Sequence, residues 1–395
     1  MSLYEDAYLE SSGSTFRLRR FSETPVIDDG KDLAEKGSGG KFSTERTGLS
    51  IFPYGPSSGG MVESVYFDIL TLGEKIEGVN YDTGYKNRSI RMSGLTAEEG
   101  ILRMERMNGV HAAAYSSLYC DICERAMKID VPDNVKLLRV AMMEIERIAS
   151  HLFLASRLTG GASQNIAHMN ILFLREELLR IIAETFGHRY FFGINRLGGI
   201  RRDVDLSRIY KKIREISGEY RGIVETLMDS RIFIDRLDRT AIIKGEDASG
   251  PTLRGAGNLI DGRKHHRYYE GISFNVSSSD AGDSLSRFIV ISREIGESTG
   301  ILEQICSRIK YVGAQQTLIS SIGETLSGGF METPSGDASM LLRLKNNMIT
   351  GIGFRSPSSL NLRAFAASMK GNTFADFLFG YESLGIWISE MGDLL

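Results

Sequence analysis

The sequence lacks the features that mark membrane-spanning, secreted and nucleic-acid-binding proteins. No apolar run approaches the ~18 residues that a helix needs to cross a bilayer. The first ten residues, MSLYEDAYLE, are acidic and contain no apolar signal region. The net charge of −3 gives no reason to expect a nucleic-acid partner. We therefore expect an intracellular chain that reaches a membrane only through partner subunits.

Cysteine is scarce as well, and the three that occur are Cys120, Cys123 and Cys306. So few cysteines exclude a disulfide scaffold. Cys120 and Cys123 form a C-x-x-C motif, but without a second such motif or a suitable pair of histidines it supplies at most half of a zinc site. In a helical context the spacing indicates two buried thiols one turn apart. The sequence also shows no Ser/His/Asp arrangement and no metal-ligand cluster of recognisable spacing.

The 395 residues, 25% of them charged and 9% aromatic, are typical of a globular protein with one large core and added lobes. Residues 1–48 are polar and predict a flexible N-terminal arm that becomes ordered only against a partner. Residues 49–395 form the main domain. Within it we expect a β-hairpin lobe at 49–85, a helical bundle at 90–310 and a C-terminal β/α part at 311–395.

The strongest helix signal runs from Val135 to Leu158 and begins after Pro132. Its apolar residues repeat at helical spacing: Leu138, Met142, Ile145, Ala149 and Leu152. Further helices are expected at about 170–185, 206–234, 283–309 and 360–369, and a hairpin at 340–354. The predicted fold class is α+β, with a central bundle of long helices and a β-lobe built from the N-terminal hairpin and the C-terminal strands.

The segment from Arg103 to Pro132 leads into this helix and brings polar residues close to an apolar interior. The candidates for function are Arg106, Asn108, His111, Arg147 and His151. Arg147 and His151 share one helix face because they are four residues apart. That face is either solvated and salt-bridged, as its glutamate neighbours suggest, or functional, as the apolar neighbours of His151 suggest.

Two further features each allow a functional and a structural interpretation. Gly109 and the small residues after it permit close approach of a ligand or partner, or merely start a helix tightly. Glu63 precedes the hairpin and is either a proton carrier or an exposed strand carboxylate.

Many motifs of one known family occur here in that family's order. They are the Gly55-Pro56 loop, GYKNR (84–88), Arg106-Met107, MMEIERIASHL (142–152), NRLGGI (195–200), SGPTLRGAG (249–257), DSLSRFIV (283–290), ETPSGD (332–337) and FRSPS (354–358). Over about residues 51–384 the chain resembles the large subunit of energy-converting nickel–iron hydrogenases and its relative, the hydrogenase-like D-type subunit of respiratory complex I.

The chain departs from this family at the metal ligands. In the hydrogenases, two C-x-x-C pairs hold nickel and iron. By the resemblance, the first pair falls at Asn108 and His111 in this sequence, and the second pair falls at about Trp387 and Glu390. Because soft thiolates hold such a centre, the resemblance implies that this chain binds no nickel–iron site and no other metal, and is no functional nickel–iron hydrogenase.

The relative in complex I uses the vacated cavity as a quinone pocket, with a histidine and a tyrosine as its two quinone ligands. By the resemblance, Val62 and Gly109 stand at those two positions here, so both ligands are absent. Glu63 instead resembles a glutamate of the hydrogenases. The resemblance implies that Glu63, Asn108 and His111 line an acceptor cavity, with a quinone possible.

It also implies that Arg88, Arg106 and His151 face the iron–sulfur cluster of the neighbouring small subunit. Positive charge beside a cluster raises its reduction potential.

The implied function is that of a redox-module subunit in a membrane-bound complex. The complex would be an NAD(P)H- or ferredoxin-linked quinone oxidoreductase coupled to ion translocation, with this chain on the cytoplasmic face of the membrane and no cofactor of its own. The implied partners are the B-type iron–sulfur small subunit, a C-type subunit, a ferredoxin-like I-type subunit, and membrane H-type and antiporter-like subunits. Two alternatives stay open: a catalytically inert scaffold or coupling subunit, and reduction of a non-quinone acceptor.

Overall fold

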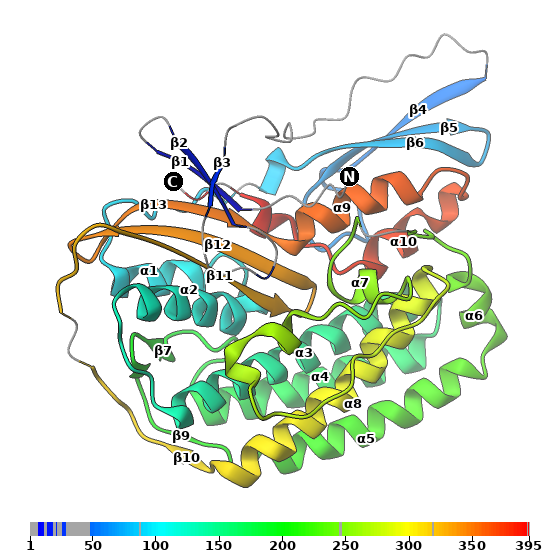
Figure 1. The fold of residues 1–395 in the computed structure, drawn as a ribbon. Helices are drawn as coiled ribbons and strands as arrows, with labels where there is room; N and C mark the ends of the chain where they lie inside the picture. The colour runs from blue at the N-terminus through cyan, green and yellow to red at the C-terminus, as the bar shows by residue number, and fades with distance from the viewer. Residues whose placement is uncertain are drawn as a thin grey trace.

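Four long helices form a bundle at the centre of the computed structural model (Figure 1). The structure describes residues 7–11, 14–18, 21, 26–28, 48–86, 88–244, 247–317, 320–392 and 394. The bundle consists of α3 (Asp133–Gly161), α4 (Asn165–Phe186), α5 (Ile209–Met228) and α8 (Ser284–Arg308). Helix α3 packs against α4 and α8, and α5 packs against the same two helices, which closes the bundle.

Local signals set the ends of these helices. Helix α3 begins after Pro132, as predicted, and nearly every residue from Leu138 to Leu152 is buried. Helix α4 ends at Gly187, which adopts a left-handed conformation (φ 75°) that glycine tolerates without strain. The Asp283 side chain accepts a hydrogen bond from the backbone N–H of Ser286 and caps α8. The predicted helices at 135–158, 170–185 and 283–309 are therefore confirmed.

One helix prediction needs correction. The expected single helix at 206–234 is two helices, because the chain breaks at Asp229 and Ser230 between α5 and α6 (Arg231–Leu237). The Ser230 hydroxyl accepts a hydrogen bond from the Phe233 N–H and starts the second helix. The remaining α-helices of the described residues are α1 (Ala97–Met104), α2 (Ala112–Ala126), α7 (Gly250–Arg254), α9 (Pro357–Ser368) and α10 (Phe377–Ser383).

The strands outside the N-terminal segment form two three-stranded antiparallel sheets and two short ladders, not one β-lobe as expected. One sheet contains β4 (Leu49–Tyr54), β5 (Tyr66–Leu72) and β6 (Lys75–Asp82); the other contains β11 (Thr325–Thr333), β12 (Gly336–Lys345) and β13 (Met348–Arg355). The ladders pair β7 (Asn195–Arg196) with β8 (Gly199–Ile200), and β9 (Val204–Asp205) with β10 (Tyr311–Val312). The sheets separate because each packs against different helices, and the broader expectation of a mixed helix-and-sheet fold is confirmed.

The two sheets lie above the bundle in Figure 1 and bring distant segments together. Strand β11 packs on α2, whereas Phe67 of β5 contacts the rings of Phe365, Phe377 and Tyr381 from α9 and α10. The predicted hairpin at 340–354 is β12 and β13, and residues 346 and 347 form its turn. The C-terminal helices are thus held between the β4–β6 sheet and the bundle, where they reach α3.

The described parts of residues 1–48 also form strands. β1 (Ala7–Ser11), β2 (Ser14–Leu18) and β3 (Val26–Asp28) make a small antiparallel sheet, and Leu9 and Leu18 pack against Leu341 of β12. These strands contact the chain's own sheet, in contrast to the expected dependence on a partner. The rest of the predicted arm lies outside the described residues, and the domain boundary at residue 49 stays a prediction.

Candidate functional site

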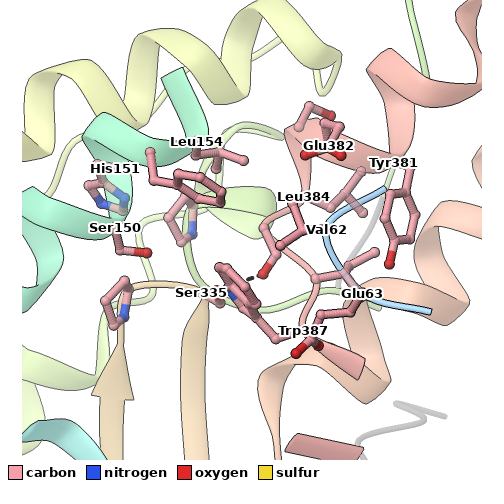
Figure 2. Close-up of a pocket in the computed structure, with 16 residues that line it drawn as sticks. Val62, Glu63, Ser150, His151, Leu154, Ser335, Tyr381, Glu382, Leu384 and Trp387 are labelled. Carbon is pink, nitrogen blue, oxygen red and sulfur yellow. Dashed lines mark hydrogen bonds between the residues drawn. The ribbon is translucent and has the colours of Figure 1, made fainter. Parts of the chain in front are cut away.

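A pocket with an empty volume of about 570 Å³ lies where α3, the β11–β12 turn, the loop before β5 and the segment after α10 meet. Figure 2 shows α3 residues on one side of the pocket and the loop before β5 on the opposite side. The polar or aromatic residues that line it are Glu63, Ser150, His151, Phe153, Ser335, Tyr381, Glu382, Ser383 and Trp387. That volume includes open solvent, and the space in which water molecules can be centred is about 30 Å³, room for one or two waters. A larger ligand therefore enters only if the lining side chains move.

Two glycines hold one wall of the pocket in place. A Cβ atom on Gly250 would lie 2.5 Å from the Cα atom of Gly336, so only glycine permits this approach. The contact joins the SGPTLRGAG and ETPSGD segments and brings Pro251 and Ser335 to the pocket.

A buried hydrogen-bond cluster lies directly behind the pocket and is centred on Glu390. Its Oε2 atom lies 2.8 Å from Nδ1 of His111 and accepts hydrogen bonds from Asn108 Nδ2 at 3.0 Å and the Tyr115 hydroxyl at 2.7 Å. The Ser358 hydroxyl donates to Oε1 at 2.6 Å. Burial raises the pKa of Glu390, but His111 and the hydroxyl donors outweigh it and lower the pKa below its usual value.

Trp387 separates this cluster from the pocket. Its ring stacks on Phe153 of α3 at 5.9 Å between centroids and meets the His111 ring edge-on at 6.3 Å. The four positions that resemble the hydrogenase ligand positions, Asn108, His111, Trp387 and Glu390, therefore meet in space across 279 residues of sequence. Apolar packing and hydrogen bonds occupy the place where thiolates would hold a metal.

Of the three residues expected to line an acceptor cavity, Glu63 lines this pocket and Asn108 and His111 lie behind it, and their role toward an acceptor stays a prediction. Glu63 lines the pocket, and its carboxylate accepts a hydrogen bond from the Ser389 N–H at 2.7 Å. Asn108 and His111 do not line it, because Glu390 draws both side chains into the buried cluster. His111 reaches the pocket only through Ser335, whose Oγ lies 3.4 Å from Nε2.

His151 lines the opposite wall and is part of a buried charge network. Its Nε2 atom lies 2.8 Å from Oε2 of Glu294. Burial lowers the pKa of His151 more than the Glu294 carboxylate raises it. Arg147, one turn before it, is also fully buried and donates to the backbone carbonyls of Glu332 and Thr333. The interpretation of this helix face as solvated is therefore wrong.

Glu294 is the hub of that network. Arg254 Nε donates to its Oε1 atom at 2.9 Å, and Arg147 Nη1 lies 3.5 Å from Oε2. Burial raises the pKa of Glu294, but Arg254 and the hydrogen bond from His151 lower it well below its usual value. Three arginines face four carboxylates in this network: Arg147, Arg254 and Arg263 against Glu144, Asp261, Glu294 and Glu332.

Two of the three residues expected to face an iron–sulfur cluster lie together on the surface, and the third does not. Arg88 Nη1 donates to the backbone carbonyl of Arg106 at 3.2 Å, and both side chains are exposed. His151 is buried against Glu294 instead, because α3 is enclosed by neighbouring helices. The placement of these three residues near a partner's cluster stays a prediction.

A different histidine lies beside Arg106. The Arg106 guanidinium covers the Phe192 ring at 4.9 Å, and His188 stacks on the same ring at 4.6 Å. Partial burial lowers the pKa of His188, and Arg106 and Arg202 lower it further. The sequence analysis missed His188; the basic and aromatic run HRYFF (188–192) is the signal that would have pointed to it.

The cysteines behave as predicted. Cys120 and Cys123 are free, fully buried thiols one turn apart on α2, and burial raises the pKa of both. The described residues contain no group of three or more His, Cys, Asp or Glu side chains arranged to hold a metal ion. Within the same residues, no helix has the length and apolarity to cross a membrane.

Comparison with known proteins shows which family the chain is similar to. Residues 164–324 match the family model described as the 49 kDa subunit of respiratory-chain NADH dehydrogenase. The D-type NADH-quinone oxidoreductase subunit of Bacillus mycoides is 26% identical over 366 residues, which cover 88% of this chain and 99% of that protein. The corresponding protein of Geobacillus kaustophilus is 27% identical over 367 residues. Over most of its length the chain is similar to the D-type, or 49 kDa, complex I subunits.

The chain matches some relatives only in part. The C/D-type NADH-quinone oxidoreductase subunit of Bacteroides thetaiotaomicron is 30% identical over 281 residues, which cover 68% of this chain and about half, 52%, of that protein.

The fold of the chain also matches a solved structure. A chain in the structure of the membrane-bound sulfane sulfur reductase, an archaeal respiratory membrane complex, superposes with a TM-score of 0.80 at 17% identity. The match covers 89% of this chain and 100% of the other, which supports the mixed helix-and-sheet architecture.

Proposed function

We propose that this D-type chain is the acceptor-side redox subunit of a membrane-bound, complex I-like oxidoreductase. The pocket between Glu63, His151 and Trp387 would receive a small oxidised acceptor, and a quinone is the first candidate. The observation that carries the proposal is the position of the pocket. It lies next to the convergence of the four former ligand positions, where hydrogenases carry out their chemistry, and it is partly apolar with a few polar groups, as ligand sites usually are.

The surface around Arg88, Arg106 and His188 is the proposed docking face for the iron–sulfur small subunit. The exposed guanidinium of Arg106 and the stacked rings of His188 and Phe192 provide a cationic, aromatic surface. Positive charge here would stabilise the reduced form of a nearby cluster and raise its potential. Residues 106–111 connect this surface to the buried cluster behind the pocket, so electrons would travel a short distance between the two.

The proposed assembly follows from the relatives. The curated relatives carry the name NADH-quinone oxidoreductase, and the structural neighbour belongs to a membrane-bound respiratory complex. We therefore propose B-type, C-type, I-type, H-type and antiporter-like partners, a position on the cytoplasmic face of the membrane, and coupling of electron transfer to ion movement. The iron–sulfur cluster would belong to the small subunit.

The test fills the pocket in the purified complex. Leu154→Trp places an indole in the cavity, and Leu102→Trp places one on the exposed face of α1 as the matched control. The small-subunit cluster is reduced, and its reoxidation by a short-chain quinone is followed by electron paramagnetic resonance. We expect Leu154→Trp to slow reoxidation at least about 10-fold, because an acceptor that cannot enter the reacting geometry loses most of its rate. The control should react like the unmodified complex.

Other outcomes point to the alternatives. Equal quinone rates in the Leu154→Trp and Leu102→Trp complexes, with both fully assembled, would refute the acceptor pocket and favour an inert scaffold or coupling role. A loss restricted to a sulfur compound tested beside the quinone would keep the pocket but change its substrate.

A further inference from the structure

Ser335 is the contact between the pocket and the buried cluster behind it. It lines the pocket, and its Oγ lies 3.4 Å from Nε2 of His111. On the far side of the imidazole, Nδ1 lies 2.8 Å from Glu390. We propose that Ser335, His111 and Glu390 form a proton relay that protonates the acceptor as it is reduced in the pocket. The proposal rests on the proposed function of that pocket.

The directions of the hydrogen bonds define the charge state of the relay. Glu390 accepts from Asn108, Tyr115 and Ser358, which leaves its carboxylate without a proton to donate to His111. Nδ1 of His111 is therefore the donor to Glu390. The Ser335 hydroxyl donates to the Gly385 carbonyl at 2.7 Å, so a hydrogen bond at its 3.4 Å contact with His111 would run from Nε2–H to Oγ. In the proposed relay both ring nitrogens therefore carry a proton before the transfer.

Burial makes this pair suitable for moving a proton. His111 is fully buried and Glu390 is 1% exposed, so water does not compete for the imidazolium. A buried carboxylate that holds Nδ1–H orients the ring and stabilises its charge, as in other acid–base pairs built on histidine. His111 and Glu390 are positioning residues, and the Ser335 hydroxyl is the group that touches the acceptor.

The transfer balances as follows. Reduction of a quinone takes two electrons, delivered singly by the iron–sulfur cluster of the small subunit, and two protons. The Ser335 hydroxyl turns from Gly385 to the acceptor oxygen and gives up its proton as the new O–H bond forms. The Nε2–H bond of His111 breaks and its proton restores the hydroxyl. Hydronium from the solvent at the pocket opening supplies the second proton. A further hydronium later reprotonates the neutral imidazole through the Ser335 hydroxyl, so solvent is the net source of both protons.

His151 on the opposite wall is unsuited to the same role. Its Nε2–H is held by Glu294, and Arg147 and Arg254 of the charge network face it. Burial and these two cations lower the pKa of His151, so near neutral pH the ring keeps only the proton that it shares with Glu294.

The test removes the hydroxyl in the intact complex. Ser335→Ala is compared with Ser156→Ala, a buried α3 serine outside the pocket whose hydroxyl also donates to a backbone carbonyl, that of Phe153 at 2.6 Å. Reoxidation of the small-subunit cluster by a short-chain quinone is measured in H₂O and in D₂O. We expect Ser335→Ala to lower the maximal rate about 10²-fold, the low end for loss of a general acid. KM should change little, and the solvent isotope effect should increase because proton transfer becomes limiting.

Ser335→Thr keeps a hydroxyl and should restore both the rate and the isotope effect. The relay is refuted if Ser335→Ala behaves like Ser156→Ala, or if Ser335→Thr is as slow as Ser335→Ala. The Leu154→Trp complex separates this result from failure of the pocket. If Leu154→Trp blocks the reaction while Ser335→Ala does not, the pocket stands and the relay falls. If Leu154→Trp has no effect, both proposals fall together.

Discussion

Replacing Glu294 by leucine should be among the most destabilising single changes in this chain. Glu294 is fully buried on α8 and is the shared partner of His151 and Arg254. Leucine has a similar size, so the substitution removes the charge and the acceptor atoms without creating a large cavity. The guanidinium of Arg254 then loses the carboxylate that lies 2.9 Å from its Nε.

The magnitude follows from what is left unpaired. Removing one partner of a buried ion pair costs about 3–5 kcal/mol, because the remaining charge stays buried. Arg254 retains Glu332 at 3.0 Å and Asp261 at 3.7 Å, so we expect about 4 kcal/mol and not more. Glu294→Gln keeps an acceptor for one donor and should cost about 2 kcal/mol. Against a total stability of about 5–15 kcal/mol, the leucine variant would lose between about a quarter and about four fifths of it.

Chemical unfolding of the purified chain, followed by circular dichroism, measures the effect. Glu303→Leu, on the exposed face of the same helix, is the matched control and should change the free energy of unfolding by less than about 0.5 kcal/mol. The double variant Glu294→Leu/Arg254→Leu keeps the net charge of the network and should recover part of the loss. If Glu294→Leu costs no more than Glu303→Leu, the network does not hold these helices together and the reasoning is wrong.

Two further predictions concern single groups. Burial lowers the pKa of His266 to about 4 from its usual 6.5, so the folded state favours the neutral ring. The neutral ring's contribution to stability is complete above about pH 6.5 and is lost as the pH falls toward 4, a change of about 3 kcal/mol. In His266→Asn the urea midpoint should therefore change less between pH 7.5 and 4.5 than in the unmodified chain. In the folded chain iodoacetamide should modify Cys306, slowly because burial raises its pKa to about 11, and leave Cys120 and Cys123 intact until urea is added. Mass spectrometry would contradict this if either buried thiol reacted as fast as Cys306.

The sequence by itself determined the long helices and the family. The apolar spacing from Leu138 to Leu152 predicts α3 because a helix that packs must repeat its apolar residues at its own period. The one-turn spacing of Cys120 and Cys123 in a helical segment likewise predicted two buried thiols. The break at Asp229 was missed, since a polar pair between two helical stretches leaves the periodicity almost unchanged.

The sequence could not decide how Arg147 and His151 are used. Their spacing places them on one helix face but does not say what covers that face. The structure encloses α3 with α4 and α8, which converts a pair that could have been solvated into part of a buried charge network. A helix buried all round carries little information about its surroundings in its own periodicity.

Only the tertiary structure decided the composition of the site. Motif positions predicted that Asn108, His111, Trp387 and Glu390 correspond to the metal-ligand positions of the hydrogenases. They did not predict that His111 binds the Glu390 carboxylate behind the pocket, or that Ser335 lines the pocket wall. Hydrogen bonds between groups 279 residues apart form only when the whole core is packed. Local spacing therefore determined which elements form, and long-range packing determined which side chains face the pocket.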